Sequence, residues 1–174
     1  MAERLHVRPL GRPDVMVYRE VRLQALRDDP SAFLTTAQEF AGRPLESVAA
    51  RLEATPHAVT FGAFMDGTLV GLLTLVREES AVLAHRANVY GVSVAPAARG
   101  QGVGDALLDT VVAHARTWPG VRSLHLAVME TQVAARRLYG RHGFRVWGRQ
   151  PDAVCQGGAL LAEDWMWRPL TPAD

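Results

Sequence analysis

The stretch that decides the fold is Val89–Leu108, VYGVSVAPAARGQGVGDALL, near the middle of a chain of 174 residues. An apolar strand runs into a turn at Pro96, and a glycine-rich loop headed by Arg99 then leads into an amphipathic helix. Glycine has no Cβ, so this loop can adopt positive φ angles and let a ligand approach the backbone closely. The helix N-terminus and the Arg99 guanidinium both favour an anion at this point. The stretch therefore predicts a loop that binds a pyrophosphate.

Two kinds of nucleotide-binding loop fit these residues poorly. A P-loop ends in Gly-Lys-Ser/Thr, whereas Gly104 is followed by Asp105 and Ala106. A dinucleotide-binding fingerprint needs its third glycine one residue later, where Asp105 stands. The arrangement Arg99-x-x-Gly102-x-Gly104 after a valine-rich strand instead resembles the acetyl-CoA loop of the GNAT superfamily of N-acetyltransferases. A tight turn between strand and helix, with incidental glycines, is the structural alternative for the loop alone.

A second stretch strengthens the resemblance. Leu124–Val128 (LHLAV) alternates like a strand, and Gln132–Phe144 follows as a helix that ends at Gly143. The matching GNAT segment is a strand, a splayed gap and a helix ending in Leu-Tyr-x-x-x-Gly-Phe, a spacing matched here by Leu138, Tyr139, Gly143 and Phe144. The resemblance extends more weakly over residues 5–170. It implies a single N-acetyltransferase domain over residues 1–174.

Composition limits the class of protein. Hydrophobic residues make up 48% of the chain and charged residues 21%, which is typical of a globular domain. A formal net charge of +1, with no basic run interleaved with aromatics, argues against a nucleic-acid partner. Cys155 is the only cysteine, and the histidines show no metal-ligand spacing, so we expect neither a disulfide nor a metal. No segment has the apolar character of a membrane span or a signal peptide, which predicts a cytoplasmic protein without a membrane partner.

The pattern along the chain predicts an α/β (α+β) fold with a mixed central β-sheet of six or seven strands and about four helices. The expected strands cover residues 5–9, 59–65, 68–77, 86–94, 124–128, 146–149 and 159–167. The expected helices cover residues 13–28, 44–53, 103–117 and 132–143. Asp66-Gly67 indicates a hairpin between the second and third strands, and residues 32–43 fit no element clearly. The resemblance adds that the sheet splays between its fourth and fifth strands.

The first helix is expected to bury one apolar stripe, made of Val17, Tyr18, Val21, Ala25 and Leu26. In GNAT proteins this helix and the segment after it form one wall of the acceptor pocket.

The resemblance assigns most of the cofactor contacts to consecutive residues. The pyrophosphate of acetyl-CoA would be held by the loop formed by Arg99, Gly100, Gln101, Gly102, Val103 and Gly104. Backbone groups of Val92 and Val94, on a bulged strand, would pair with the pantetheine arm, and an amide near Gly91 would stabilise the oxyanion. Gln132 stands where the family usually has an asparagine, so that contact is expected to shift or to be lost.

Tyr139 is the expected general acid for the departing thiolate, with plain packing beside Leu138 as the alternative. The base is open among Glu39, Glu130 and His85, of which Glu39 is our first choice. The late position of Cys155, without a histidine arrangement, favours direct transfer over a covalent enzyme intermediate.

The sequence leaves the acceptor amine open among a polyamine, an antibiotic amine, an amino acid and a protein N-terminus. Tyr90 is a candidate for the wall of the acceptor site. Trp165 and Trp167 alternate in the last strand, where packing or the contact of a homodimer would explain them. Two other functions stay open: an inactive acyl-CoA-binding sensor, and a nucleotide-binding α/β domain.

Overall fold

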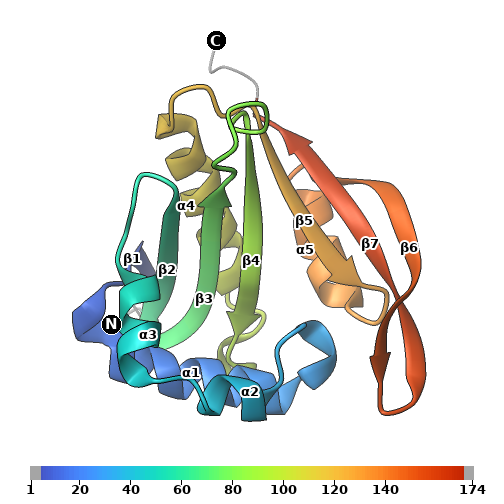
Figure 1. Ribbon diagram of the computed structural model, residues 1–174. Helices are drawn as coiled ribbons and strands as arrows, with labels where there is room; N and C mark the ends of the chain where they lie inside the picture. The colour runs from blue at the N-terminus through green and yellow to red at the C-terminus, as the bar shows by residue number, and fades with distance from the viewer. Residues whose placement is uncertain (1–4, 171–174) are drawn as a thin grey trace.

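A computed structural model describes residues 5–170, which form one mixed seven-stranded sheet in the order β1-β2-β3-β4-β5-β7-β6 (Figure 1). Its strands are β1 (Leu5–Pro9), β2 (Ala58–Met65), β3 (Thr68–Arg77), β4 (Arg86–Val94), β5 (Ser123–Met129), β6 (Arg145–Gln156) and β7 (Ala159–Pro169). Its helices are α1 (Val15–Asp28), α2 (Ala37–Ala41), α3 (Leu45–Leu52), α4 (Val103–Thr117) and α5 (Val133–Arg141). The predicted α/β class and the seven-stranded sheet are confirmed.

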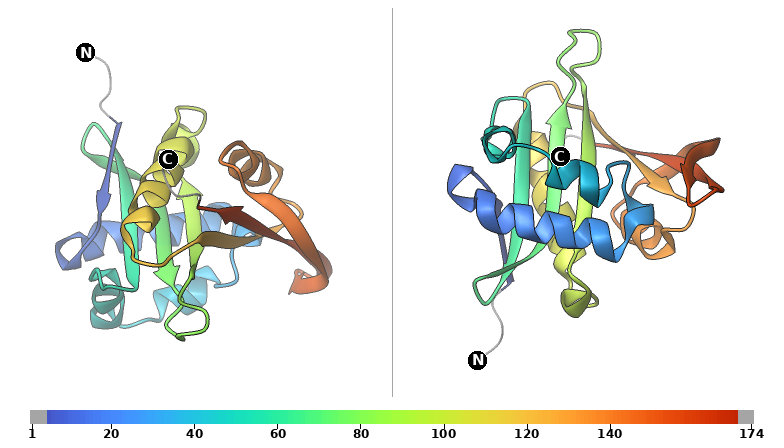
Figure 2. Two further views of the ribbon diagram at one scale, coloured as in Figure 1. Left: turned by 90° about the horizontal axis from the view of Figure 1, so that it is seen from above. Right: turned by 60° about the horizontal axis from the view of Figure 1, so that its bottom comes forward.

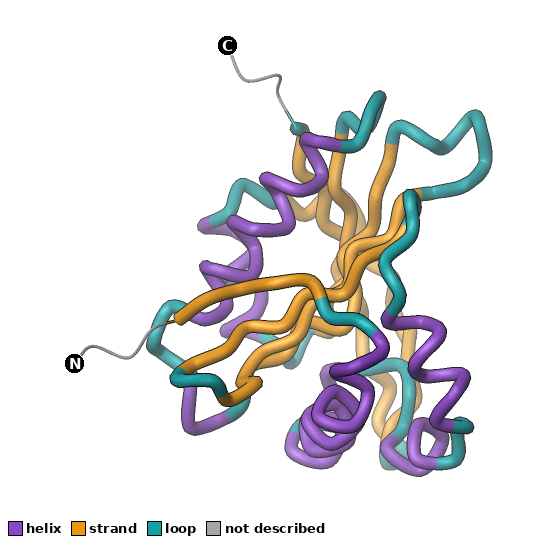
Figure 3. Tube along the Cα trace, turned by 90° about the vertical axis from the view of Figure 1, so that its left-hand side faces the viewer, coloured by secondary structure: helices purple, strands orange, loops and turns teal. Residues whose placement is uncertain are grey.

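The helices cover both faces of the sheet (Figures 2 and 3). On one face, α4 and α5 pack over the larger core, where the α4 side chains Val103, Leu107, Leu108, Val111 and Val112 are all buried as their spacing predicts. On the other face, α1 and α3 cover a smaller core that includes Leu52, Phe64 and Leu72. The loop before α4, on one face, and the connection from α1 to α2, on the other, come together at the C-terminal end of β4.

Two details of the first helical region differ from the predictions. Val17 is 38% exposed, because α1 turns Val15, Tyr18 and Val21 toward the sheet instead. The segment 32–43, which fitted no element, contains α2, so the described chain has five α-helices. Thr36 caps α2 in a capping box with Glu39, a Thr-x-x-Glu signal that the periodicity alone did not reveal.

The central strands separate as the family resemblance implies. β4 and β5 run parallel and pair only where Arg86–Asn88 faces Ser123–His125, after which the strands diverge (Figure 1). On its other edge β4 carries a bulge, because the register with β3 shifts between Leu72 and Thr74. Gly91 lies in this bulge with φ +60°, a conformation that side chains rarely adopt. The sheet is therefore open at one end between β4 and β5.

The last two strands form the predicted hairpin through the turn at Gly157-Gly158. β6 is longer than expected, because its pairing with β7 continues past an irregularity between Gln150 and Val154. Trp165 in β7 is 38% exposed, and its ring lies 6.4 Å from that of Trp147 in β6, which is 65% exposed.

Candidate functional site

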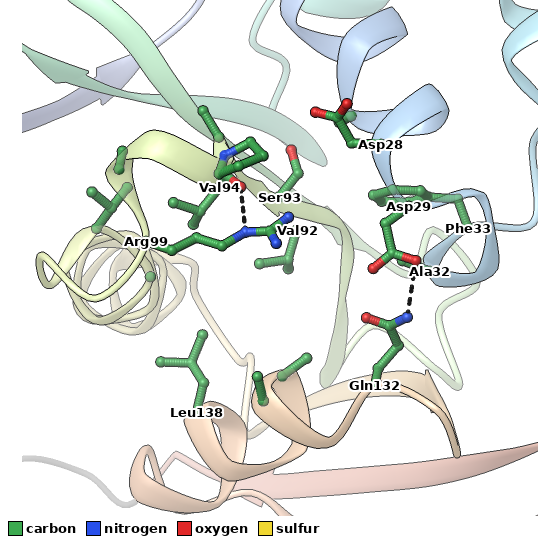
Figure 4. Close-up of a pocket in the computed structure, with 18 of the residues that line it drawn as sticks. Asp28, Asp29, Ala32, Phe33, Val92, Ser93, Val94, Arg99, Gln132 and Leu138 are labelled. Atoms are coloured by element: carbon green, nitrogen blue, oxygen red, sulfur yellow. Dashed lines mark hydrogen bonds between the residues drawn. The ribbon is translucent and has the colours of Figure 1, made fainter.

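A cavity of about 700 Å³ occupies the opening between β4 and β5 (Figure 4). Its walls come from the end of β4, the loop before α4, the first turns of α4 and α5, and the connection from α1 to α2. Figure 4 shows Arg99 and Val94 on one side of the cavity and Asp29 and Phe33 on the other, with α5 below. The cavity thus brings together both of the stretches that the sequence singled out. We call it the cofactor cavity.

The loop before α4 offers a row of unpaired backbone amides. Gly100 and Gly102 have φ angles of +73° and +78°, and a Cβ on either would meet nothing within 4 Å. Within the described chain, the amides of residues 100–105 donate to no protein acceptor, and the first bond of the α4 ladder runs from Ala106 to Gly102. Because the helix dipole adds partial positive charge here, the loop is suited to an anion such as a pyrophosphate.

Two residues of this loop also make contacts within the protein. A Cβ on Gly104 would lie 2.8 Å from a methyl group of Leu138, so this glycine allows the close packing of α4 against α5. The Gln101 side chain is exposed and donates to the Ala97 carbonyl at 2.9 Å. Neither Gln101 nor Gly102 lines the cavity. A contact between either residue and a ligand would therefore come from its backbone amide.

Arg99 lies at the mouth of the cavity with an exposed side chain. Its Nε donates to the Val94 carbonyl at 3.2 Å, which holds the guanidinium beside the loop (Figure 4). The two terminal nitrogens have no acceptor among the described residues and can bind oxygens of a ligand.

The end of β4 presents an open backbone edge to the cavity. The Ala95 amide donates to the Val70 carbonyl of β3 at 2.7 Å, so Ala95 faces its antiparallel neighbour. Successive residues of a strand direct their backbone groups to alternate edges, and those of Val94 and Val92 therefore face the gap toward β5. β5 pairs with β4 only up to Asn88, which leaves this edge available to an extended ligand, although the Val94 carbonyl already accepts one bond from Arg99 Nε.

Tyr139 on α5 is 6% exposed and lines the cofactor cavity. Its ring packs edge-on against Phe144, with the centroids 6.0 Å apart, and belongs to the larger core. Its hydroxyl nevertheless makes no hydrogen bond within residues 5–170 and is not among the atoms sealed from solvent. Burial raises the pKa of Tyr139 well above its usual value, because desolvation disfavours the phenolate. The hydroxyl is thus a protonated donor without a protein partner.

Gln132 lies just before α5 and links two walls of the cavity. Its Nε2 donates to Asp29 Oδ1 at 3.2 Å (Figure 4). The same Nε2 donates to Ser31 Oγ at 3.2 Å, and Ser31 Oγ donates to Asp29 at 2.8 Å. The Gln132 amide is thus bonded to the α1–α2 connection. Neither Asp29 nor Ser31 was a candidate from the sequence, since both stand about a hundred positions from Gln132.

The structure brings none of the three candidate bases to the cavity. The Glu39 carboxylate accepts from the Thr36 amide at 2.8 Å, and these Thr36 bonds lower the pKa of Glu39. Glu130 accepts from the Ala162 amide at 2.9 Å and pairs with Arg149, which fastens β5 to the last hairpin. His85 precedes β4 at the end opposite the cavity. Glu39 is therefore a helix-capping residue here, because its carboxylate is bound to Thr36 and lines no cavity.

A second pocket, of about 180 Å³, lies on the other side of the β4 bulge. It is enclosed by α1, α3, the α2–α3 connection and the faces of β2 and β3, and Tyr90 and Gly91 form its β4 wall. Tyr90, the candidate for a wall of the acceptor site, thus lines this pocket, with 54% of its surface exposed. Sequence reasoning missed the arginines Arg22, Arg43 and Arg51, which also line this pocket.

Two features are absent from residues 5–170. No three His, Cys, Asp or Glu side chains in this part of the chain gather as a metal-binding group. No helix among these residues is both long and apolar enough to cross a membrane.

The chain is similar to known acetyltransferases in sequence and in fold. A sequence profile of the acetyltransferase (GNAT) family matches residues 23–144, which include both motifs. A putative acetyltransferase from Salmonella typhimurium, solved with its cofactor acetyl-CoA, has a TM-score of 0.81 at 20% identity over 98% of this chain and 96% of its own. A GCN5-related N-acetyltransferase from Kribbella flavida has a TM-score of 0.75 at 27% identity over 95% and 98%. A probable acetyltransferase from Staphylococcus epidermidis has a TM-score of 0.80 at 19% identity over 97% and 100%.

Proposed function

The chain belongs to the acetyltransferase (GNAT) family, and we propose that it transfers the acetyl group of acetyl-CoA directly to a primary amine. The observation that carries this proposal is the row of unpaired amides at residues 100–105 beside Arg99, next to a cavity that Tyr139 also lines. The loop is shaped for a pyrophosphate, and the open β4 edge is shaped for an extended arm. A domain that binds a nucleotide without such an arm would leave the open β4 edge unoccupied.

The residues present fit the cofactor. The amides of the loop and the Arg99 guanidinium would bind the pyrophosphate oxygens, since both supply donors and positive charge. The backbone groups of Val92 and Val94 would bind the amides of the pantetheine arm as a neighbouring strand would. Acetyl-CoA supplies an acetyl thioester, whose carbonyl carbon is the electrophile. A backbone amide near the bulge at Gly91–Val92 is the proposed donor to the developing oxyanion, because a fixed N–H needs no reorganisation.

Tyr139 would act on the leaving thiolate. In the overall reaction the amine nitrogen forms a bond to the acetyl carbon, the C–S bond breaks, the amine loses one proton and the sulfur gains one. The raised pKa of Tyr139 keeps its hydroxyl protonated at neutral pH, so it can donate to the sulfur throughout. The same raised pKa makes permanent loss of its own proton unfavourable, because a free thiol has a pKa of about 8.5. We therefore assign Tyr139 a hydrogen bond to the sulfur and the relay of the amine's proton.

The test of the proposal separates binding from turnover. Calorimetric titration with acetyl-CoA measures binding, and release of free thiol in the presence of a mixed panel of primary amines measures transfer. We expect saturable binding and thiol release that depends on the amine, with acetylated amine as the product. Binding without turnover over the whole panel would favour the inactive sensor, and absence of binding would overturn the proposal.

A further inference from the structure

The pocket beside the β4 bulge is strongly cationic, and we call it the arginine pocket. Arg22 comes from α1, Arg43 from the α2–α3 connection and Arg51 from α3. None of the three forms an ion pair with a carboxylate in the described part of the chain. No Asp or Glu lines the pocket. Three unpaired guanidinium groups around one small space repel a cation and attract an anion.

Arg22 stands at the boundary between the arginine pocket and the cofactor cavity. Its guanidinium carbon lies 4.4 Å from the ring centroid of Phe33, which lines the cofactor cavity. Its Nη1 is 3.4 Å from the position that a Cβ on Gly91 would take, at the bulge where transfer would occur. That Nη1 is sealed from solvent and has no acceptor within residues 5–170. A buried charged donor without a partner is costly, and a ligand anion would satisfy it.

All three arginines act on the pKa of Tyr18. Burial raises the pKa of this pocket-lining tyrosine, while the positive charges of Arg22, Arg43 and Arg51 act in the opposite direction. Burial lowers the pKa of Arg22, and the positive charge of Arg43 lowers it further, as expected for two like charges close together. Arg43 is the smallest of the causes that lower the pKa of Glu39, whose carboxylate is bound to Thr36 and lies outside the pocket.

We propose that the acceptor is a small amine that also carries an anionic group, either a carboxylate or a phosphorus oxyanion. This inference rests on the proposed function and deepens it. The arginines would bind the anionic group, and the amine would then lie toward Gly91 and the acetyl group. The volume of about 180 Å³ suits a small acceptor, since drug-sized ligands occupy roughly 300–1,000 Å³. The paired hydroxyls of Thr60 and Thr74, 2.9 Å apart, add polar contacts on the sheet side.

The same charges would also prepare the amine for reaction. An ammonium group in a positive field has a lowered pKa, because the field disfavours its charged form. A larger share of the acceptor is then neutral and nucleophilic at neutral pH. This effect replaces part of the work of a general base, which agrees with the absence of any carboxylate from the pocket lining.

The experiment compares matched acceptors at saturating acetyl-CoA. Amino acids are paired with their own amides, aminoalkylphosphonates with the corresponding alkylamines, and a polyamine and a peptide with a free N-terminus complete the set. We expect kcat/KM to favour the anionic member of a pair by about 10- to 100-fold, the value of one or two hydrogen bonds to a charged group. The carboxylate and phosphonate series show which anion is the better ligand. Equal or better rates with amides, polyamine or peptide would overturn the inference.

Variants assign the preference to the arginines. Arg22→Gln and Arg51→Gln are expected to reduce the ratio of kcat/KM between an amino acid and its amide by about 10-fold or more. Arg51 is exposed, so its variant keeps the test valid if loss of Arg22 from the Phe33 ring prevents folding. Arg27→Gln is the control, because Arg27 is an exposed α1 residue that lines neither space.

The outcomes separate this inference from the proposed function. An unchanged ratio in both folded variants, or an equal change in the Arg27→Gln control, would contradict the role of the arginine pocket. Turnover that prefers neutral or cationic amines would overturn the inference and leave acetyl transfer in place. Failure to bind acetyl-CoA would overturn the proposed function, and this inference with it.

Discussion

The cofactor cavity and the arginine pocket lie on opposite sides of the same bulge in β4, and they are built from different parts of the chain. The cofactor cavity uses backbone groups of consecutive residues, namely the amides of 100–105 and the open edge at Val92 and Val94. The arginine pocket uses the side chains of Arg22, Arg43 and Arg51 from separate elements. A backbone site needs particular residues at fixed spacing, whereas a side-chain site can be assembled from any elements that pack together.

This difference explains why the family is easier to identify than the acceptor. The loop and the helix with Tyr139 carry the two motifs whose spacing resembles the GNAT family, and both lie within the residues that the family profile matches. The acceptor side depends on three side chains, and each can change without altering the fold. If the two sites act independently, a variant on the cofactor side changes acetyl-CoA binding or kcat, and a variant in the arginine pocket changes the acceptor preference.

The largest effect is expected from Tyr139→Phe. The change removes a hydroxyl that has no protein partner and leaves the ring packed on Phe144. We expect kcat to fall by about 10²- to 10⁴-fold, the usual contribution of a positioned proton donor. The dissociation constant of acetyl-CoA, measured by calorimetry, should change little. An unchanged kcat would show that Tyr139 only packs in the core.

Arg99→Gln should affect the cofactor side alone. One exposed guanidinium beside the loop is lost, and acetyl-CoA affinity should fall by about 10-fold, with a weaker dependence on salt. The readout is the dissociation constant at two salt concentrations. Arg137→Gln is the matched control, since Arg137 is exposed on α5 and lines neither space. Equal losses in both variants would indicate a general effect of net charge.

Gly100→Ala tests the conformation of the loop. Gly100 has φ +73°, and Gly67 in the β2–β3 turn has φ +80° with equally open surroundings, so Gly67→Ala is a matched control. Each change should lower the free energy of unfolding by about 1–2 kcal/mol, the cost of placing a Cβ in the left-handed region. Only Gly100→Ala should also weaken acetyl-CoA binding. If half or more of the conformational cost appears in the binding free energy, the dissociation constant rises by about 3- to 10-fold. Parallel losses of affinity would contradict the loop as the binding element.

The smallest effect is expected from Glu39→Gln. The Thr36 bonds hold the pKa of Glu39 below its usual value, so the charged carboxylate stabilises the fold above its unfolded pKa of about 4.3. This contribution is lost as the pH falls through the folded pKa. Urea unfolding should therefore show a small deficit in the variant at pH 7 that disappears in acid, with kcat unchanged. A large loss of kcat would instead support Glu39 as the base.

The sequence predicted the elements whose residues carry a local pattern. The bounds of β4 and α4 and the buried face of α4 agree with the prediction. Glycine spacing and apolar periodicity are patterns of residues close together in the sequence, so they can be recognised without knowledge of the tertiary structure. Gly104 has a further reason to be small that the sequence did not show, since a Cβ there would meet Leu138 on another helix. The short helix α2 has a capping signal but too few residues for a periodic pattern.

The parts that escaped prediction depend on distant partners. Gln132 binds Asp29 and Ser31 across the cavity mouth, and the three arginines meet only when α1 and α3 pack on the sheet. On the sequence, Arg22 stands within an ordinary amphipathic helix, where a solvated face is the simplest interpretation of an arginine. Its burial against Phe33 and Gly91 is a consequence of tertiary packing alone.

The most direct test of the account is the thermal unfolding of the purified protein with acetyl-CoA, CoA, NAD or ATP. A ligand at about a hundred times its dissociation constant adds about 2.7 kcal/mol, or roughly 5–10 °C for a domain of this size. We predict such a shift with acetyl-CoA and CoA, and none of this size with NAD or ATP, because only the CoA ligands have an arm that reaches the open β4 edge. No shift with either CoA ligand would contradict the assignment of the cofactor cavity, and acetyl transfer with it.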